Sequence, residues 1–161
     1  MEQPMDNKMS SKIESTNLKI EFVNLTLGIE PSNIETSHIS AIFLVGIKDG
    51  MILAARNERG WDIPGGHVDA DDTDLYSALV REVDEESGVT LKKAKPFAIM
   101  RFDGKDKSML FYVSDAFELE EFIPKEDAFE RQMMPIPEFI EKYNWKKNVI
   151  QPIIEYAIQN K

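Results

Sequence analysis

The middle of the chain holds three glutamates at helical spacing. Glu82, Glu85 and Glu86 are three and four residues apart, so a helix places all three side chains on one face. At about 100° per residue, the apolar side chains of this segment fall on the same side of the helix. They are Leu75, Ala78, Leu79 and Val83. A solvated acidic stripe would lie opposite the apolar residues, so the pattern predicts a helix that buries its carboxylates in part.

Carboxylates on an apolar face are unfavourable unless something compensates their charge. Like charges three or four residues apart destabilise a helix, and partial burial makes ionisation costlier. Either some of the three have raised pKa values, or a cation lies nearby. Arg81 precedes Glu85 by four residues and can form an ion pair with it, which leaves a negative cluster suited to a hard divalent ion such as Mg2+. A solvated face is the simpler alternative, and Asp84, on the other side of the helix, fits it.

A glycine-containing loop precedes this helix. Gly65 and Gly66 follow Pro64 directly after a short apolar strand, and paired glycines allow the backbone to approach a ligand closely. Residues 71–74 are Asp, Asp, Thr and Asp, all favourable N-cap types, and Gly88 is a natural helix terminator. The segment therefore predicts a strand, a glycine loop and a helix of about 14 residues that ends before Gly88.

This segment resembles the signature of the Nudix hydrolases, G-x5-E-x7-R-E-U-x-E-E-x-G-U, in which U is a bulky aliphatic residue. The second half matches at every fixed position, and the matching residues are Arg81, Glu82, Val83, Glu85, Glu86, Gly88 and Val89. In the first half, the spacing from Gly66 leads to Asp72 instead of a glutamate, and eight residues rather than seven separate Asp72 from Arg81. One inserted residue and a shortened acid account for the difference. The resemblance is most specific over residues 61–89 and extends in outline over residues 39–159.

The order of the expected elements indicates an α+β fold, because two hairpins are followed by helices and one helix is inserted in mid-sheet. The resemblance implies the Nudix-type α/β/α sandwich with a central mixed sheet, as a single domain over residues 17–161 after a flexible tail at residues 1–16. It also implies a Mg2+-dependent enzyme, with Mn2+ as a substitute, that hydrolyses the pyrophosphate linkage of a nucleoside diphosphate linked to another moiety. The partner would be this small molecule, not a nucleic acid or a membrane.

The resemblance also implies roles for individual residues. Glu82, Glu85 and Glu86 would hold the metal ion together with the carbonyl of Gly65, the family's usual backbone ligand. Glu82 and Glu85 are both candidates for the general base. Arg81 would orient the carboxylates by salt bridging rather than touch the substrate.

Residues outside the acidic helix are less specific candidates. Family members often add a metal-binding carboxylate from a later loop, and Glu130 is the first choice for it, with Glu126 second. A solvated surface acid is an equally good interpretation of Glu130. His67, Trp61 and Arg56 flank the glycine loop and could contact substrate. A polar surface residue, a core aromatic and an exposed cation are the simpler interpretations of these three.

The alternation of apolar residues, together with the positions of turn residues, predicts the remaining strands and helices. Strands are expected over residues 18–27, 38–48, 51–56, 95–102 and 108–117, with tight turns at residues 49–50 and 103–104. Helices are expected over residues 137–143 and from residue 149. Asn148 would be the N-cap of the last helix and would make Pro152 tolerable in its first turn. Met133 and Met134 are expected in the core.

Composition excludes several classes of protein. The sequence has no cysteine, which excludes disulfides, thiolate metal sites and cysteine nucleophiles. A net charge of −10 opposes nonspecific binding to nucleic acid. A polar N-terminal segment and the lack of a long apolar run predict a cytoplasmic protein. There is no P-loop motif, and an EF-hand loop beginning at Asp69 fails because Asp74 stands where glycine is required.

The main alternative to an enzyme is a noncatalytic Nudix-fold module that binds a nucleotide or an ADP-ribose-like ligand as a sensor. The intact signature residues Arg81, Glu82 and Glu85 favour catalysis, whereas the altered first half of the signature at Asp72 favours the sensor. Turnover of substrate in the presence of Mg2+ distinguishes the two. The sequence also leaves room for a homodimer.

Overall fold

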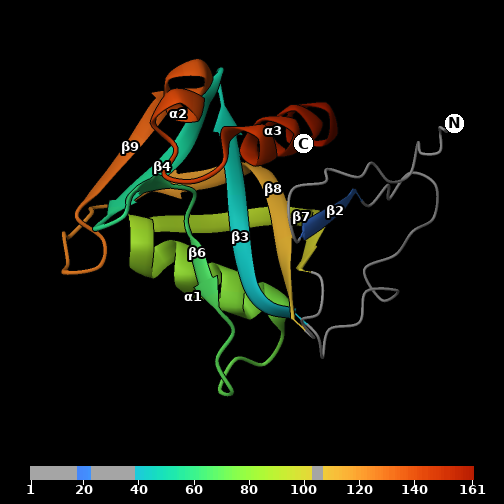
Figure 1. Ribbon diagram of the computed structural model, residues 1–161. Coiled ribbons are helices and arrows are strands. Elements are labelled where there is room, and N and C mark those ends of the chain that lie inside the picture. Colours follow the sequence, from blue (N-terminus) through green and yellow to red (C-terminus); the bar gives the residue numbers. More distant parts are fainter. Residues whose placement is uncertain (1–17, 23–38, 103–106) are drawn as a thin grey trace, which may run out of the picture.

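The structure, a computed structural model, describes residues 18–22, 39–102 and 107–161 (Figure 1). Its strands are β2 (Leu18–Phe22), β3 (Ile39–Lys48), β4 (Met51–Asn57), β5 (Gly60–Asp62), β6 (Gly65–His67), β7 (Val89–Phe102), β8 (Ser108–Leu119) and β9 (Glu130–Pro135). They form one sheet in the order β2-β7-β8-β3-β4-β5, with β6 paired to β3 and β9 to β4. β3 and β8 are parallel and the other described pairs are antiparallel, so the predicted mixed sheet is confirmed.

Helices cover both faces of this sheet. α1 (Leu75–Ser87) lies on one face, and α2 (Ile136–Lys142) and α3 (Lys147–Asn160) lie on the other (Figure 1). Side chains alternate along β3, so that Leu44 belongs to the core with α1 and Val45 to the core with α3. These two cores confirm the predicted α/β/α sandwich. Among the described residues, no helix is long and apolar enough to cross a membrane.

The structure differs from the expected elements mainly at strand ends. Within the described residues β2 ends at Phe22, and residues 23–27, the turn at residues 103–104 and the predicted tail at residues 1–16 lie outside them. The domain span of residues 17–161 therefore stays a prediction. β7 begins at Val89 rather than at residue 95, because its pairing with β8 continues to Leu119 opposite Val89. Sequence reasoning missed β9, whose residues include none of the β-branched types that indicate a strand.

The prediction of Asn148 as the N-cap of the last helix is wrong. α3 begins at Lys147, and its N-cap is Lys146, which makes no capping hydrogen bond with its side chain. Pro152 therefore lies inside the helix, where its missing N–H cannot pair with the Asn148 carbonyl. Burial of an apolar face offsets this loss. The buried residues of α3 are Val149, Ile150, Ile153, Ile154 and Ala157.

The methionines beside Pro135 lie where the sequence predicts. Met134 is fully buried in the core under α3, and Met133 is partly buried against the core under α1. Both come from β9, so this strand contributes to the two faces of the sheet in turn.

Candidate active site

α1 begins and ends where the sequence predicts. Asp74 is its N-cap, and the Asp74 Oδ1 accepts a hydrogen bond from the Ser77 N–H at 2.7 Å. Gly88 ends the helix in the left-handed conformation, with φ of 63°, and its N–H donates to the Asp84 carbonyl at 2.9 Å. The buried side of the helix consists of Ala78, Leu79, Val83 and Ser87. These contacts fix the rotation of the helix as well as its ends.

The glycine loop lies against this helix through two of the three glutamates. The Gly65 N–H donates to the Glu86 Oε1 at 3.2 Å. A side chain at Gly66 would displace the Glu82 carboxylate, because a Cβ built there would lie 2.6 Å from it. The paired glycines therefore bring the backbone of β6 into contact with the carboxylates of α1.

Arg81 joins the segment before α1, the glycine loop and the glutamates in one network. Its Nε and Nη2 donate to Oδ1 and Oδ2 of Asp72 at 3.0 and 2.9 Å, a bidentate ion pair. Its Nη1 lies 3.3 Å from Glu82 and 3.2 Å from Glu85, and its Nη2 donates to the His67 carbonyl at 3.2 Å. The predicted ion pair between Arg81 and Glu85 is confirmed.

Asp72, which the signature spacing reaches from Gly66, is a buried partner of Arg81. Its side chain is 7% exposed and accepts a hydrogen bond from the Asp69 N–H at 2.7 Å. The Arg81 hydrogen bonds, followed by that of the Asp69 N–H, lower the pKa of Asp72. Asp72 is therefore ionised at neutral pH, and its charge is paired with Arg81.

The three glutamates of α1 differ in burial. The side chain of Glu82 is 14% exposed, whereas that of Glu85 is 51% exposed. Glu86 is half-buried beside the Gly65 N–H. The prediction that all three share the apolar face is wrong for Glu85, because the helix is rotated so that this residue lies at the edge toward solvent.

Burial and neighbouring acids give Glu86 an unusual pKa. Burial is the largest cause, and together with the charges of Glu82, Asp62 and Asp127 it raises the pKa of Glu86 to about 7 against the opposing effect of the Gly65 N–H. Burial also raises the pKa of Glu82. A cation beside Glu82 and Glu86 would stabilise their ionised forms, because the protein alone compensates their negative charge only in part.

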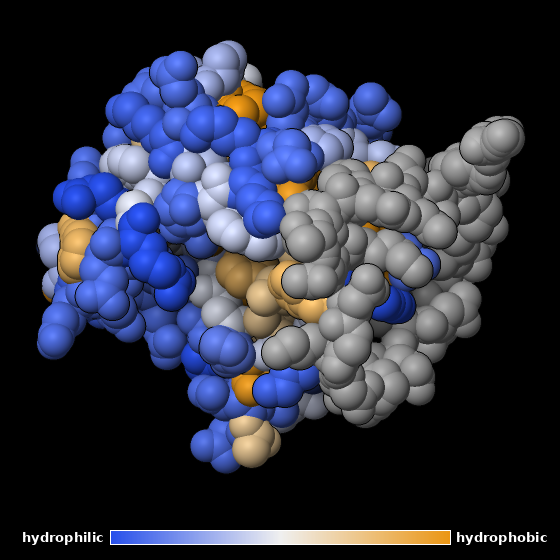
Figure 2. All heavy atoms as spheres, viewed as in Figure 1, coloured by the Kyte–Doolittle hydropathy of each residue, from blue (hydrophilic) through white to orange (hydrophobic). Residues whose placement is uncertain are grey.

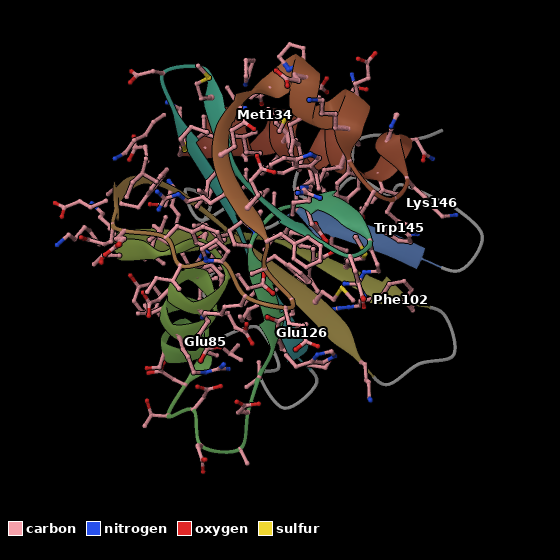
Figure 3. All side chains as sticks on the ribbon, turned by 90° about the vertical axis from the view of Figure 1, so that its left-hand side faces the viewer. Glu85, Phe102, Glu126, Met134, Trp145 and Lys146 are labelled. Carbon is pink, nitrogen blue, oxygen red and sulfur yellow. The ribbon has the colours of Figure 1, made fainter. Side chains whose placement is uncertain are left out.

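The segment after β8 carries acidic side chains that differ in their contacts. Glu130, the predicted residue, pairs with Arg56, whose Nε lies 3.0 Å from the Glu130 Oε1. Glu126, the second choice, is exposed (Figure 3). Asp127, which sequence reasoning missed, lies close enough to Glu86 to raise its pKa. The three acids look alike in the sequence, and only the folded loop distinguishes them.

The Arg81 side chain contacts Glu82 and Glu85, two of the carboxylates that the sequence assigns to one metal ion. In the described part of the chain, no group of three or more histidine, cysteine or acidic side chains has the arrangement needed to hold a metal ion. The Arg81 Nη1 contacts both Glu82 and Glu85. A cation can contact both acids only if their side chains turn away from this nitrogen.

The other residues near the loop make structural contacts. His67 is exposed, and its backbone carbonyl holds Arg81. Trp61 packs against the core, as its simpler interpretation predicts. Arg56 lies over the Trp61 ring, with its Cζ 5.9 Å from the ring centroid, in addition to its ion pair with Glu130.

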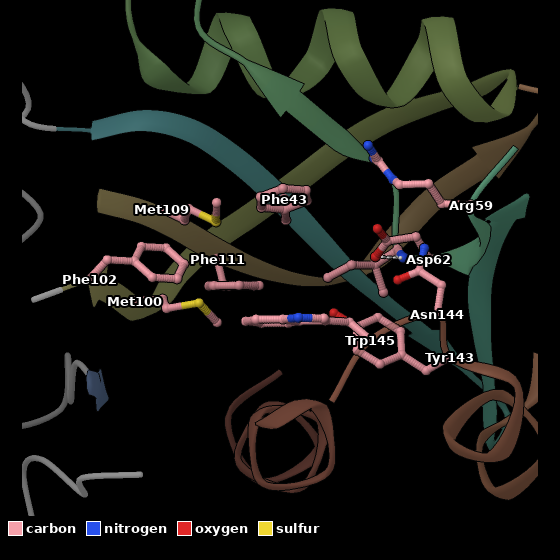
Figure 4. Close-up of a pocket in the computed structure, with 11 residues that line it drawn as sticks. Phe43, Arg59, Asp62, Met100, Phe102, Met109, Phe111, Tyr143, Asn144 and Trp145 are labelled. Atoms are coloured by element: carbon pink, nitrogen blue, oxygen red, sulfur yellow. Dashed lines mark hydrogen bonds between the residues drawn. The ribbon is translucent and has the colours of Figure 1, made fainter. Parts of the chain in front are cut away.

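A cleft of about 300 Å³ opens beside Asp62, and sequence reasoning did not find it. Aromatic and methionine side chains form most of its wall, and Arg59, Asp62 and Asn144 lie together at one end (Figure 4). Figure 2 shows apolar side chains gathered in the hollowed middle of one face of the molecule. The aromatic residues of the cleft are Phe43, Phe102, Phe111, Tyr143 and Trp145.

The polar end of the cleft holds a carboxyl and an amide. Burial raises the pKa of Asp62 to about 6, against the hydrogen bond that the Ile63 N–H donates to its Oδ1 at 2.7 Å. The Asn144 side chain also lowers this pKa, although its Nδ2 is buried and forms no hydrogen bond of acceptable geometry. Asn144 therefore acts on the Asp62 carboxyl from a position that is closed to solvent.

Comparisons with known proteins identify the family to which the chain belongs. A family model described as the NUDIX domain matches residues 36–153. A search of curated proteins finds no significant match. Among solved structures, the chain is similar to MutT from a study of Aliivibrio salmonicida and Vibrio cholerae, with 20% identity and a TM-score of 0.60 over 76% of this chain and 98% of the other.

Two further structures share the fold. One is a variant of the Bacillus subtilis pyrophosphohydrolase BsRppH, with 19% identity and a TM-score of 0.67 over 88% of this chain and 90% of the other. The other is the NUDIX domain of Shewanella oneidensis NrtR in complex with ADP ribose, with 13% identity and a TM-score of 0.55 over 83% and 94%. Because the family model covers most of the chain, the chain belongs to the Nudix family.

Proposed function

We propose that the protein is a Mg2+-dependent hydrolase that cleaves the pyrophosphate linkage of a nucleoside diphosphate linked to another moiety. The observation that supports this most strongly is the position of Glu82 and Glu86, whose carboxylates lie against the glycine loop near an aromatic cleft. Asp62 lines the cleft and is close enough to Glu86 to act on its charge. Phe43, which lines the cleft, pairs with Gly65 of the glycine loop, so a diphosphate on a ligand in the cleft would lie near these carboxylates.

The donor types suit a hard divalent cation, although the acidic side chains of the described residues would have to rearrange to surround one. Carboxylate and carbonyl oxygens are the ligands that Mg2+ prefers, and Nudix hydrolases generally use divalent metals. The ligands we propose are Glu82, Glu85, Glu86, the carbonyl of Gly65 and one later carboxylate, either Glu130 or Asp127. Asp127 has the stronger support, because its charge acts on Glu86 whereas Glu130 has another partner. A bound Mg2+ would neutralise the diphosphate and lower the pKa of a coordinated water.

The protein itself supplies a base and a means of orienting it. Glu82 and Glu85 remain the two candidates for the general base. The raised pKa of Glu82 brings it nearer to neutral pH, where a base is most effective, and the exposure of Glu85 gives it access to water. Arg81 contacts both carboxylates and so limits their movement, as expected of a residue that orients them.

The cleft suits the nucleoside part of such a substrate. Its aromatic side chains offer faces on which a base can stack, and Trp145 remains 42% exposed beside it. Arg59 supplies a guanidinium suited to a phosphate oxygen. The complex of the NrtR NUDIX domain with ADP ribose also supports a nucleotide derivative as the ligand.

The second candidate function is noncatalytic binding of a nucleotide or an ADP-ribose-like ligand. The observation that favours it is the contact of Arg81 with both Glu82 and Glu85, which occupies two of the proposed metal ligands. If Arg81 keeps its contact with both carboxylates when a ligand binds, the ligand would occupy the cleft without being hydrolysed.

We expect Mg2+-dependent release of a phosphate-containing product from at least one compound in a panel of dinucleotides, nucleoside triphosphates and ADP-ribose. Each compound is incubated with Mg2+, with Mn2+ and with a chelator, and the products are separated by chromatography. Tight binding without turnover under either metal would support the noncatalytic alternative. Equal turnover in the presence of the chelator would contradict the proposed metal dependence.

Glu86→Gln should stabilise the metal-free protein at pH 8. The pKa of Glu86 is about 7 in the folded protein and near the ordinary value of 4.5 in the unfolded one. Because the folded pKa is the higher, this carboxyl stabilises the fold below about pH 4.5 and loses that contribution as the pH rises to about 7. Glutamine has no such loss, so the free energy of unfolding of the variant should be higher by up to about 3 kcal/mol at pH 8.

Thermal unfolding at pH 4 and pH 8 measures this difference. The variant should have the higher Tm at pH 8, and the two proteins should converge at pH 4. Saturating Mg2+ should then stabilise the unchanged protein more than Glu86→Gln, because only the former gains a carboxylate ligand. Equal stability at both pH values would contradict the raised pKa of Glu86.

A further inference from the structure

A second hollow, of about 330 Å³, lies where β7, β8 and the end of α3 meet. It is lined by residues 93–95 of β7, residues 113–116 of β8 and Lys161, and is here called the basic hollow. Three lysines and one aspartate are its charged residues, so positive charge is in excess there. It shares no residue with the cleft beside Asp62 or with the ligands proposed for Mg2+.

Irregular pairing of two strands forms the basic hollow. β7 advances by two residues from Lys93 to Lys95, whereas β8 advances by three between their partners, Ala116 and Val113. An extra residue of this kind is a β-bulge, which interrupts the ladder of hydrogen bonds and bends its strand. The buried Ser114 hydroxyl holds the bulge, because it donates to the Lys93 carbonyl and accepts a hydrogen bond from the Ala116 N–H at 2.9 Å. The shape of the hollow therefore does not depend on the lysine side chains.

The two lysines of β7 in this hollow lack partners. Lys93 and Lys95 are exposed, and within the described part of the chain neither side chain forms an ion pair or a hydrogen bond. Lys92 beside them does, because its Nζ lies 3.8 Å from the Glu118 carboxylate. The chain has 29 acidic and 19 basic residues, so acidic partners are plentiful. Among the described residues, Asp115 alone adds an acid to the basic hollow.

The charges of these two lysines are uncompensated, whereas that of Lys161 has a local explanation. Lys161 caps the C-terminal end of α3, where the partial negative charge of a helix favours a cation. Lys93 and Lys95 both line the hollow, and residues two apart on a strand have Cα atoms about 7 Å from each other. Their like charges repel each other, and an anion between them would offset this repulsion. Lysine side chains are long and flexible, so both ammonium groups can reach one ligand.

We propose that the basic hollow binds a diphosphate group through Lys93 and Lys95. A diphosphate carries several charged oxygens, so it can contact both ammonium groups at once. The hollow is about as large as the cleft of about 300 Å³, which leaves room for further atoms of the ligand. Free pyrophosphate and the diphosphate of a nucleotide share this chemistry. The proposal goes beyond the proposed hydrolysis, because it requires neither a metal ion nor the carboxylates of α1.

Calorimetric titration with inorganic pyrophosphate tests this site in the metal-free protein, in the presence of a chelator and about 10 mM salt. Lys93→Gln and Lys95→Gln should each weaken binding about tenfold, because each removes a hydrogen bond to a charged group. Both side chains are exposed, so neither variant should change the Tm. Raising the salt to about 150 mM should weaken binding to the unchanged protein. A parallel titration with ADP distinguishes the two sources, because tighter binding of ADP indicates a nucleotide and equal or weaker binding indicates free pyrophosphate.

Lys92→Gln is the matched control. It removes the same charge from the neighbouring residue, whose side chain pairs with Glu118 and does not line the basic hollow. Its affinity for pyrophosphate should stay within about twofold of that of the unchanged protein. Amide NMR signals locate the ligand, because those of Ser114 and Ala116 should shift when pyrophosphate is added and those of the glycine loop should not.

Three results would overturn the proposal. The first is that the unchanged protein binds neither pyrophosphate nor ADP under these conditions. The second is that Lys92→Gln weakens binding as much as Lys93→Gln, which would indicate attraction to overall charge instead of a site. The third is that the amide shifts are confined to the glycine loop and the aromatic cleft. Failure of the proposed function is seen separately, as a lack of turnover in the substrate panel, and leaves the basic hollow unaffected.

Discussion

Glu85→Gln should lower kcat by on the order of 1,000-fold while leaving the fold intact. The substitution replaces one carboxylate oxygen by an amide NH2 group, so it removes the charge and one proposed metal ligand with almost no change of shape. Glu85 is also one of the two candidates for the general base. Because its side chain is 51% exposed, its loss should have little effect on packing. Steady-state kinetics with Mg2+ and a thermal unfolding curve measure the two quantities.

Asp84→Asn is the matched control for this experiment. Asp84 is the neighbour of Glu85 on α1, is exposed, and loses the same charge in the same way. Its side chain lies on the other side of the helix, so the variant should retain kcat within about twofold, as expected for a surface change away from the site. An unaltered kcat in Glu85→Gln would contradict the assignment of Glu85 to the metal site.

The sequence predicts α1 well because the signals for this helix are local. Asp74 caps it through a hydrogen bond to a residue three positions away, and Gly88 ends it through its own backbone conformation. Helical periodicity also predicts which apolar residues are buried. It did not predict the exposure of Glu85, because a small rotation of the helix on the sheet decides which residues at the edge of the face meet solvent.

Long-range contacts explain what the sequence did not reveal. Arg131 and Lys125 fasten the loop that carries Asp127 to the end of α1, and nothing in the order of acids in that loop indicates this. The cleft is built from β3, β5, β7, β8 and the segment before α3, so no single motif marks it. β9 also depends on a long-range contact, because its residues form a strand by pairing with β4.

The inserted residue before α1 has a structural consequence that the spacing alone does not show. The Asp72 carboxylate reaches Arg81 with two hydrogen bonds and is 7% exposed. Asp72 therefore holds the Nε and Nη2 atoms of the Arg81 guanidinium. The remaining nitrogen, Nη1, contacts Glu82 and Glu85. Asp72 thus holds the arginine that contacts both glutamates.

Gly66→Ala should reduce kcat by about 100-fold or more, because the catalytic geometry depends on a missing side chain at this position. A Cβ there would lie 2.6 Å from the Glu82 carboxylate, closer than atoms in contact can approach. The carboxylate must turn away, so the metal affinity measured with Mn2+ should fall together with kcat.

Gly50→Ala is the matched control, and the two glycines should fail in opposite ways. A Cβ at Gly50 meets nothing within 4 Å, but its φ of 75° is strained for alanine. This variant should lose about 1 kcal/mol of unfolding free energy and keep its kcat and Mn2+ affinity. If Gly66→Ala instead behaves like Gly50→Ala, with lower stability and full activity, then Glu82 does not need its place against the glycine loop. The close approach of this loop to α1 would then serve the fold alone.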